Sequence, residues 1–336
     1  MIDRLQRRPE DVLLVVSIDT EEDNWDRSRH DVRIENIGAL PRMAAFFDRF
    51  GVRPTYFTTY QVAIDPRAAA VMREVGCDGR GEIGAHLHPW NTPPLTEAFE
   101  PRNSMLKNLP ADLQLEKIQA LTAALKKAFH FSPTVFRTGR YGIGRDTVGA
   151  LLRCGYRVDS SVSPFVSLKR MDDGPSFVGA PMVPYRLAAG RDVREPAPDG
   201  ELVEIPLSYG FNRGPFRVWD PARRLLEARP LRWFRLAGLA ERTGLIRRLT
   251  LCPELASAED MLTLSRRLLE HGVRHLHLTW HSPSFMPGLS PFAATVRDVE
   301  RLYASIETYF EGLSRLTRFR FATVSEAAAQ HTQTAR

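Results

Sequence analysis

The residues with the clearest capacity for chemistry are two histidines, His86 and His88, in the segment Glu82-Ile-Gly-Ala-His-Leu-His-Pro-Trp90. An extended backbone points side chains two residues apart to the same side. Pro89 also favours extended geometry at His88. Imidazoles that face carboxylates form a common kind of metal site. The pair therefore favours a metal-assisted hydrolase.

The carboxylates that could complete such a site lie in Ile18-Asp-Thr-Glu-Glu-Asp23, at the end of a short apolar run. In a strand, Asp19 and Glu21 would face the same way, and Asp23 shares their parity. The alternative for this segment is an acidic loop that binds no ligand.

A second H-x-H pair, His275 and His277, lies inside another apolar run. Thr279 and His281 share its parity. We expect His275 and His277 to be interior residues whose ring nitrogens are satisfied by hydrogen bonds. His281 stands just beyond the run, within Thr279-Trp-His-Ser-Pro283, where an ionisable side chain can take part in a site.

Short apolar runs alternate with helical patterns along the whole chain, which is typical of repeated βα units and a parallel sheet. Helical patterns with recognisable ends cover about 41–51, 66–76, 111–131 and 257–272. The strand candidates are Val12–Ile18, Thr55–Thr59, Glu82–His86, Thr134–Arg137, Tyr156–Ser160, Leu202–Leu207, Arg274–Trp280 and Arg318–Thr323. They favour an α/β fold, an irregular (β/α) barrel of seven or eight parallel strands.

Ionisable residues gather at one end of these strand candidates. Five of them lie at or just past a C-terminal strand end: Asp19, His86, Arg137, Asp159 and His281. The active sites of (β/α) barrels are built on that rim. Unrelated surface residues would not be expected to share this position so often, and the pattern predicts one site there.

Two irregular segments interrupt the alternation. Residues 89–110 are rich in Pro and Asn, and residues 161–250 open with a stretch rich in Pro, Gly and charged residues. Both are longer than an ordinary connection between elements. We expect a single domain over 1–336, in which these insertions at the rim shape a substrate cleft.

The formal charge of +6 comes from one part of the chain. Residues 214–249 hold nine arginines against three acidic residues, together with two Trp and two Phe. Such a stretch favours contact with an anionic membrane surface or with a phosphate-bearing substrate. The alternative is a solvated basic face, since Arg outnumbers Lys 41 to 5 throughout the chain. The sequence contains no recognised nucleic-acid-binding module, and no nucleic-acid partner is expected.

The cysteines and the N-terminal residues bear on the compartment. Cys77, Cys154 and Cys252 are scattered without a C-x-x-C pair, which fits a reducing cytoplasm and argues against a thiolate zinc site. No small-residue cleavage site follows Val12–Ile18, which we interpret as a strand rather than a signal peptide. No apolar run approaches the ~20 residues that span a bilayer. We expect a cytoplasmic protein, in peripheral contact with the inner membrane face if the basic segment binds lipid.

Five short blocks stand in a specific order and spacing: Ser17-Ile-Asp-Thr-Glu21, Glu82-Ile-Gly-Ala-His86, Phe136-Arg-Thr-Gly-Arg-Tyr-Gly142, Gly155-Tyr-Arg-Val-Asp-Ser-Ser161 and Leu278-Thr-Trp-His-Ser282. Together they resemble the polysaccharide deacetylases of the NodB-homology type, carbohydrate esterase family 4, and their WalW-like branch in particular. The resemblance extends from about Val12 to Thr323. It implies a NodB-type barrel and a metal-dependent hydrolase that removes acetyl groups, chiefly N-acetyl, from a polysaccharide or glycan precursor.

The resemblance also implies roles in the acidic segment. Asp19 stands where the family has its catalytic base. Thr20 replaces the metal-binding Asp of the common pattern. Branches that space the two acids as D-x-D imply Glu21 as the ligand instead, with Asp23 in reserve.

For the histidines, the resemblance gives His86 as the first metal ligand. The second histidine of the family is four residues on, at the position of Trp90, and His88 is the nearest substitute. Two imidazoles and one carboxylate suit zinc, or a harder divalent ion such as cobalt or manganese.

Four further positions match the family pattern. His281 corresponds to the general acid, and Arg137 to the arginine that pairs with the catalytic Asp19. Tyr141 corresponds to the residue whose backbone N–H binds the oxyanion, and Asp159 to the acid that orients the catalytic histidine. The alternatives for Arg137, Tyr141 and Asp159 are an ordinary salt bridge, a core phenol and a strand-end cap.

Substrate contacts are less specified. Trp90 and Trp280 can pack against a sugar face or belong to the core, and Arg140 can meet an anionic sugar or a phosphate. The basic segment favours a lipid-linked or nucleotide-linked glycan precursor, as in lipopolysaccharide or capsule assembly. Two other functions stay open: a metal-independent amidohydrolase that acts on a small amide, and a non-catalytic glycan-binding protein.

Overall fold

The computed structural model describes residues 12–25, 28–29, 32–227, 238 and 242–334. Within them, one curled sheet has the order β10-β1-β2-β3-β4-β5-β7-β6, and β11 also pairs with β1. All pairings in it are parallel except that of β6 with β7. The strands are β1 (Val12–Thr20), β2 (Thr55–Thr58), β3 (Glu82–Leu87), β4 (Val135–Thr138), β5 (Val158–Asp159), β6 (Tyr185–Leu187), β7 (Leu202–Glu204), β10 (His275–His281) and β11 (Phe319–Ala322).

All eight strand candidates are present, which confirms the irregular (β/α) barrel. The sheet is curled rather than closed by a continuous ladder. On the side away from β1, isolated hydrogen bonds rather than a ladder join β10 to neighbouring segments among the described residues. The N–H of Thr279 donates to Leu251 O (3.0 Å), and the N–H of His277 donates to Ser208 Oγ (2.8 Å).

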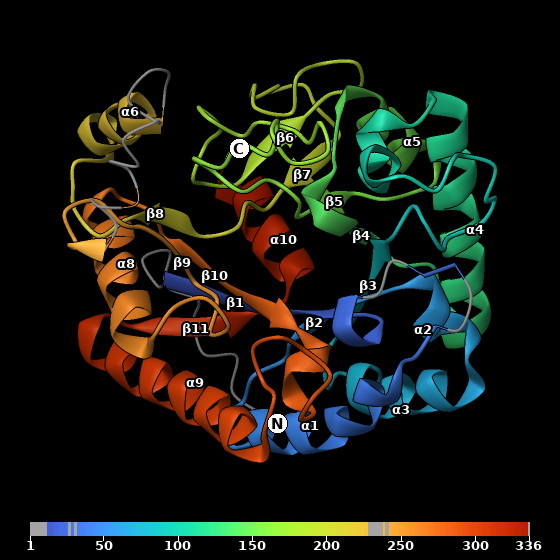
Figure 1. The fold of residues 1–336 in the computed structure, drawn as a ribbon, viewed down its shortest axis with the longest axis horizontal. Helices are drawn as coiled ribbons and strands as arrows, with labels where there is room; N and C mark the ends of the chain where they lie inside the picture. The colour runs from blue at the N-terminus through green and yellow to red at the C-terminus, as the bar shows by residue number, and fades with distance from the viewer. Residues whose placement is uncertain (1–11, 26–27, 30–31, 228–237, 239–241, 335–336) are drawn as a thin grey trace.

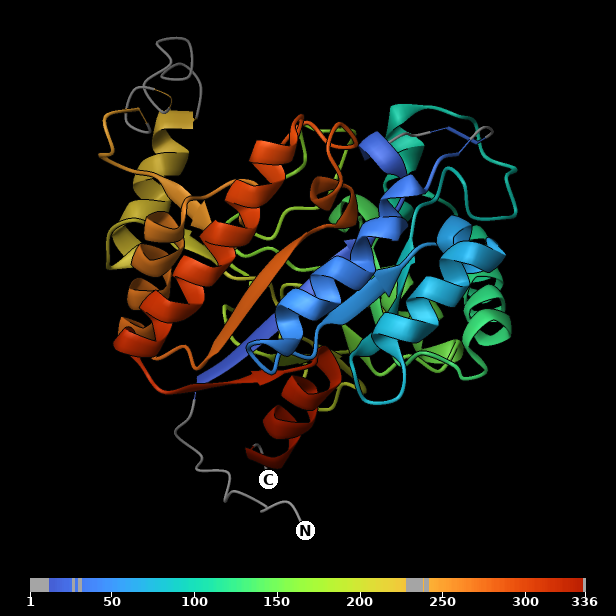
Figure 2. The same ribbon diagram turned by 90° about the horizontal axis from the view of Figure 1, so that it is seen from below.

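Helices cover the outside of the curled sheet, as Figures 1 and 2 show. Their ends follow the sequence signals: the Asp65 side chain accepts from the N–H of Ala68, and the Ser257 hydroxyl accepts from the N–H of Asp260. The outer helices are α1 (Leu40–Asp48), α2 (Tyr60–Ile64), α3 (Pro66–Gly76), α4 (Ala111–Phe129), α5 (Arg145–Arg153), α8 (Ala258–Glu270) and α9 (Val296–Leu316).

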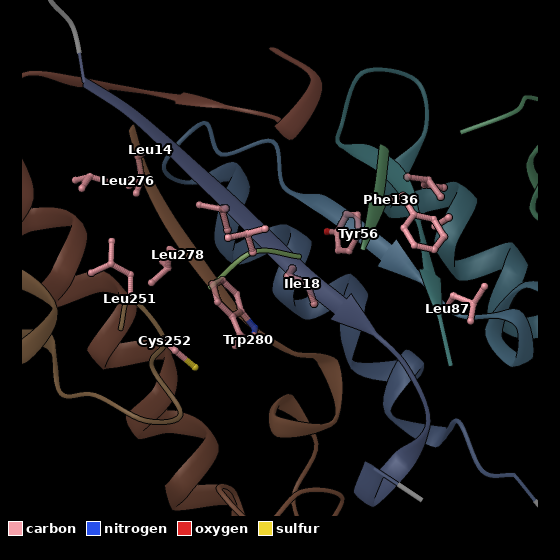
Figure 3. Packing of buried hydrophobic residues seen from close by; sticks show 14 of the residues in the cluster. Leu14, Ile18, Tyr56, Leu87, Phe136, Leu251, Cys252, Leu276, Leu278 and Trp280 are labelled. Carbon is pink, nitrogen blue, oxygen red and sulfur yellow. The ribbon is translucent and has the colours of Figure 1, made fainter. Parts of the chain in front are cut away.

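Alternation along β1 divides the core into two parts. Leu14 and Ile18 point outward to the large apolar cluster under the helices (Figure 3), whereas Leu13 and Val15 point inward. The inner cluster is completed by α10 (Val324–Thr334), which fills the lower end of the barrel. Burying one such side chain contributes roughly 1.5–3 kcal/mol. The next inward positions of β1 carry polar side chains, so the interior changes from apolar to polar toward the rim.

The two irregular segments contain regular elements of their own. Residues 89–110 include η3 (Pro101–Ser104) and η4 (Leu106–Asn108). Residues 161–250 include β6 and β7, and then an antiparallel pair, β8 (Tyr209–Phe211) with β9 (Arg248–Thr250), beside α6 (Phe216–Glu227). Part of the basic segment, 228–237 and 239–241, lies outside the described residues.

Across the described part of the chain, no helix combines the length and the apolar character needed to cross a membrane.

Candidate active site

The polar end of the barrel interior opens into a cavity of about 390 Å³. Its walls come from the C-terminal ends of β1, β3 and β10 and from the turn after β4, the rim that the sequence predicted. The side chains that line it are Asp19, Glu21, Asn24, His86, His88, Trp90, Arg140, Tyr141 and His281.

Glu21, His86 and His88 form a buried group whose potential ligand atoms all lie within 4.8 Å of one another. Glu21 Oε2 is 3.1 Å from His88 Nε2 and 3.5 Å from His86 Nε2. Among the described residues, Glu21 Oε1 has no hydrogen-bond partner. Two imidazole nitrogens and a carboxylate with an unused oxygen fit a divalent cation such as zinc.

The other ring nitrogens of these histidines are already engaged. His86 Nδ1 lies 3.2 Å from the carbonyl oxygen of Arg137, and His88 Nδ1 lies 2.7 Å from Glu22 Oε2. A carbonyl and a carboxylate accept N–H bonds at Nδ1, so each Nε2 is directed at the group and could give its lone pair to a bound cation. Burial alone would lower the pKa of His88, but the charges of Glu22 and Glu21 outweigh it and raise the pKa to about 10.

Glu21 is held as an anion in this group. Burial raises the pKa of Glu21, but the charge of His281 and hydrogen bonds from His86 and His88 together lower it well below its usual range.

Asp23, the reserve ligand, has a different role. Its carboxylate accepts from the N–H of Glu35 (2.9 Å) and of Asn36 (3.1 Å), and from Asn36 Nδ2 (2.6 Å). It therefore fixes the start of η2 (Glu35–Ala39). The expectation that Asp23 stands in reserve as a metal ligand is wrong, because the chain leaves strand geometry after Thr20 and alternation no longer applies.

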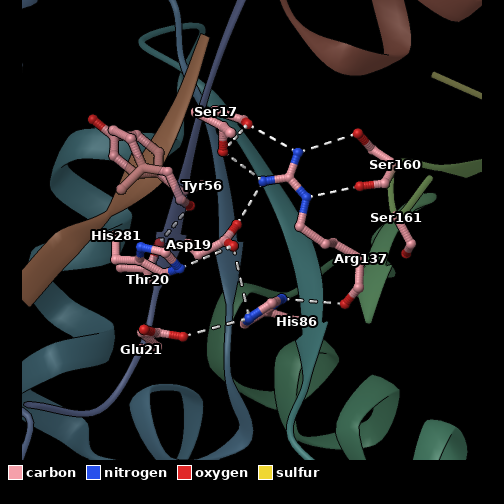
Figure 4. Close-up of polar contacts among 12 residues, drawn as sticks. Ser17, Asp19, Thr20, Glu21, Tyr56, His86, Arg137, Ser160, Ser161 and His281 are labelled. Atoms are coloured by element: carbon pink, nitrogen blue, oxygen red, sulfur yellow. Dashed lines mark hydrogen bonds and ion pairs between the residues drawn. The ribbon is translucent and has the colours of Figure 1, made fainter. Parts of the chain in front are cut away.

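Asp19 and Arg137 form the ion pair that the resemblance implied (Figure 4). Arg137 is fully buried, and its Nη1 donates to Asp19 Oδ1 at 2.6 Å and to Thr279 Oγ1 at 2.9 Å. Its Nη2 donates to the hydroxyls of Ser17 and Ser160. With Oδ1 engaged, Asp19 keeps Oδ2 directed at the cavity.

Asp19 Oδ2 lies 3.9 Å from His86 Nε2 and 3.9 Å from His281 Nε2. His281 comes from the last position of β10, which pairs in register with Asp19 of β1. This register places the carboxylate and the imidazole side by side on the same edge of the sheet.

His281 is oriented by Glu254, not by Asp159. Glu254 Oε2 lies 2.8 Å from His281 Nδ1, and Ser284 donates to the same carboxylate. Burial would lower the pKa of His281, but the charges of Glu254 and then Glu21 raise it to about 10. The imidazole therefore carries a proton at neutral pH and presents Nε2 to the cavity.

Asp159 lies deeper in the interior, beside Glu204, and its expected orienting role is wrong. Its carboxylate accepts from the N–H and the hydroxyl of Ser161, both at 2.9 Å. Burial raises the pKa of Asp159, and burial together with the charge of Asp159 raises the pKa of Glu204 well above its usual range. The pair is a buried acid pair that supports the β5–β7 edge.

The turn after β4 presents Arg140 and Tyr141 to the cavity. Both have left-handed backbone angles, with φ of 53° and 57°, which is uncommon for residues other than glycine. Arg140 Nη1 pairs with Asp172 Oδ2 at 2.6 Å and also bonds Ser104. Its charge is thus balanced within the protein, and Arg140 lies at the cavity wall, where a substrate contact stays a prediction.

The two tryptophans differ. Trp90 lines the cavity, and its ring stacks on His88 with centroids 4.2 Å apart. Trp280 is 1% exposed and packs between Phe47 and Phe285 in the outer core. A substrate contact by Trp280 is therefore wrong, because even positions of β10 face the helices.

The two histidines of the second pair, His275 and His277, differ in their hydrogen bonding. His277 Nε2 lies 2.8 Å from Ser17 Oγ and 3.3 Å from Arg137 Nη2, which confirms the predicted hydrogen bonding of this interior residue for Nε2 but not for Nδ1. His275 is equally buried, but neither of its ring nitrogens has a hydrogen-bond partner among the described residues. The expectation that hydrogen bonds satisfy His275 is wrong.

Sequence reasoning missed two acids, Glu22 and Glu254. Glu22 has the opposite parity to Glu21 and reaches the site because the strand ends at Thr20. Glu254 follows β9 in an irregular stretch that carries no periodic signal. A search of every carboxylate in the predicted acidic segment Ile18–Asp23 would have found Glu22 but not Glu254.

Comparison with known proteins gives the fold. No protein-family model and no curated protein matches the sequence. Among solved structures, the chain is similar to a candidate polysaccharide deacetylase from Mycobacterium smegmatis, with 16% identity, a TM-score of 0.55, and coverage of 97% of this chain and 92% of that one. It is similar to a candidate glycoside hydrolase/deacetylase from Parabacteroides distasonis, with 14% identity, a TM-score of 0.59, and coverage of 97% and 73%.

A 4-alpha-glucanotransferase from Thermococcus litoralis also shares the fold, with 12% identity, a TM-score of 0.50, and coverage of 95% of this chain and 40% of that one. The curled parallel sheet is therefore the NodB-type barrel. Because a shared fold accommodates more than one reaction, the function has to be argued from the side chains.

Proposed function

We propose that this protein is a metal-dependent hydrolase that removes acetyl groups, N-acetyl above all, from a glycan. One observation carries the proposal: Asp19 Oδ2 lies 3.9 Å from His281 Nε2, at the edge of the Glu21, His86 and His88 group. A base, an acid and a cation site thus share one cavity, and hydrolysis of an amide needs all three functions. We place it in the WalW-like branch because Glu21 and His88 replace the common ligand positions.

Glu21, His86 and His88 would hold the cation. When bound, it would polarise the acyl carbonyl and acidify a water molecule. Asp19 accepts the proton of the attacking water through Oδ2, while Arg137 holds Oδ1 and balances its charge. The backbone N–H of Tyr141, turned by left-handed geometry at the cavity wall, is the proposed donor to the oxyanion.

His281 supplies the proton that the departing nitrogen needs. Glu254 holds its Nδ1–H at 2.8 Å, so the proton that can leave is the one on Nε2, which faces Asp19 and the cavity. The charge of Glu254 raises the pKa of His281, which favours the acid form of the imidazole. The orienting carboxylate fixes the ring in the orientation that proton transfer requires.

The test is release of acetate from N-acetylated and O-acetylated oligosaccharides by protein loaded with zinc, cobalt or manganese. Asp19→Asn and His281→Ala should each lower the rate by about 10²- to 10⁴-fold, the usual contribution of a general base or acid. His130→Asn, at an exposed left-handed position remote from the cavity lining, is the control. Equal inertness of the folded wild type and both variants on every substrate would favour a glycan-binding protein.

Elemental analysis of the purified protein distinguishes the two enzymatic alternatives. A stoichiometric metal that is lost together with activity on chelation supports the deacetylase. Full activity after complete removal of metal would instead support a metal-independent amidohydrolase.

We further propose that the substrate is a lipid-linked or nucleotide-linked precursor in lipopolysaccharide or capsule assembly, and that the protein works in the cytoplasm at the inner membrane. The support is the outer face of α6, which exposes Arg217, Val218, Arg224 and Leu225 together. Sedimentation with vesicles of anionic lipid, but not with zwitterionic vesicles, is the expected result. Recovery of the native protein from the periplasm would contradict the cytoplasmic location.

A further inference from the structure

His88 reaches the proposed metal group from an unusual place. The ring stands two residues after His86, and the position four residues after His86 carries Trp90. Nevertheless His88 Nε2 is 3.1 Å from Glu21 Oε2, closer than the 3.5 Å of His86 Nε2. Some feature of this chain must hold the ring in that position.

Two consecutive glutamates bracket the His88 imidazole. Glu21 faces Nε2, and Glu22 Oε2 lies 2.7 Å from Nδ1 on the opposite side of the ring. Glu22 is 1% exposed, and its second oxygen accepts from Asn91 Nδ2 at 3.0 Å. Both oxygens of Glu22 are therefore used within the protein, and its carboxylate cannot turn toward the cavity without losing two bonds.

The faces of the ring are fixed as well. Trp90 stacks on His88 at an interplanar angle of 22°. On Gly139, a Cβ would lie 2.5 Å from His88 Cδ2 and 2.7 Å from Leu87 O, so the absence of a side chain there makes room for the ring.

The loop that carries Trp90 is itself anchored. The buried Lys117 Nζ donates to the carbonyls of Pro89 (2.9 Å), Thr92 (2.7 Å) and Pro94 (2.6 Å), and Arg29 Nε donates to Trp90 O (3.2 Å). The stacking surface therefore has a fixed position.

We propose that Glu22 is the positioning residue that turns His88 into a metal ligand. By accepting a hydrogen bond from Nδ1–H, Glu22 favours the tautomer whose lone pair is on Nε2. The negative charge of Glu22 also makes the imidazole a stronger electron-pair donor to a metal. This inference rests on the proposed metal site, and it assigns to Glu22 an effect on metal affinity rather than a part in the chemical step.

The experiment measures zinc and cobalt affinity by competition with a chromogenic chelator, together with the visible absorption of the cobalt-loaded protein. Glu22→Ala should weaken metal binding by about 10- to 100-fold, the usual effect of losing an orienting partner. Glu22→Gln keeps an oxygen acceptor for Nδ1–H but loses the charge, and it should show a smaller loss. If Glu22→Ala misfolds, the Gln variant still tests the role of the charge.

Glu82→Gln is the matched control. Glu82 is a largely buried carboxyl at the opposite end of β3, where it accepts from Thr55 Oγ1 at 2.7 Å, and its loss should leave metal affinity unchanged. Wild-type affinity and an unchanged cobalt spectrum in both Glu22 variants would overturn the inference, as would a wild type that binds neither metal. A wild type that binds metal but releases no acetate would overturn the proposed function alone.

Discussion

The protein contains two H-x-H pairs at the same spacing, and they do different things. His86 and His88 lie at the C-terminal end of β3, whereas His275 and His277 lie in the first half of β10. All four rings are buried within the barrel. His86 and His88, the upper pair, contact carboxylates, and the pKa of His88 is raised to about 10. Among the described residues no carboxylate pairs with His275 or His277, the lower pair, and burial lowers the pKa of His275 to about 4.

The difference shows what the spacing determines and what it leaves open. Alternation fixes the direction of the side chains, and in both pairs that direction is inward. The height along the strand decides the environment, because the inward positions of β1 change from Leu13 and Val15 at the bottom to Asp19 at the top, with Glu21 just beyond the strand. A histidine becomes a ligand only where the neighbouring strands supply opposite charge.

Removal of one imidazole of the upper pair should have the largest effect on activity. His88→Ala deletes a proposed ligand, and the several kcal/mol of stabilisation that a metal provides corresponds to a loss of about 10³-fold in acetate release. Metal content by elemental analysis should fall in parallel. Retention of both metal and activity would show that the upper pair is no more a metal site than the lower one.

A smaller effect should follow from displacing His88 without deleting it. In Gly139→Ala the new Cβ would clash with His88 Cδ2, and we expect metal affinity to fall by about 10- to 100-fold, as for other disturbed ligands. Gly149→Ala is the control, since its Cβ would meet Ala189 at an ordinary 3.6 Å. Chelator competition measures both. Equal affinity in the two variants would contradict the close fit around His88.

The lower pair should be visible in the pH dependence of stability. The pKa of His275 is about 4 in the folded protein against 6.5 in the unfolded chain, so the unfolded state binds more protons between these values. Stability should therefore fall as the pH drops below about 6.5, by roughly 2 kcal/mol at pH 5 from this residue.

In His275→Leu this part of the acid sensitivity should disappear. Urea unfolding at pH 7.5 and pH 5 measures it, with the exposed His130→Asn as the control. An equal loss of stability at pH 5 in wild type and His275→Leu would show that protonation of His275 does not destabilise the folded protein.

The predictable part of the structure is the part that regular strands control. Eight apolar runs gave eight strands, and the C-terminal ends of β1 and β3 brought Asp19, Glu21, His86 and His88 together. Predictions failed where the chain leaves strand geometry. Just past Thr20, where alternation ends, Asp23 binds the start of η2 instead of serving as a reserve ligand, and Glu22, for which no role was predicted, reaches His88.

The orienting acid of His281 shows the same limit. Asp159 ends β5 and Glu254 follows β9, and only the path of the irregular segment after β9 brings Glu254 to the ring. The predicted substrate contact of Trp280 failed for the opposite reason. Trp280 follows the alternation of β10, and its even position places it in the outer core.

The last helix bears on how the molecule assembles. Val324, Ala327 and Ala328 of α10 seal the interior beneath Leu13 and Val15, and β1 pairs with β10 and β11, which are made some 260 and 300 residues later. During synthesis, β1 can pair early with β2, but almost the whole polypeptide must be made before β10, β11 and the floor of the barrel exist. A ribosome-bound fragment that stops before α10 cannot keep solvent away from the lower histidines.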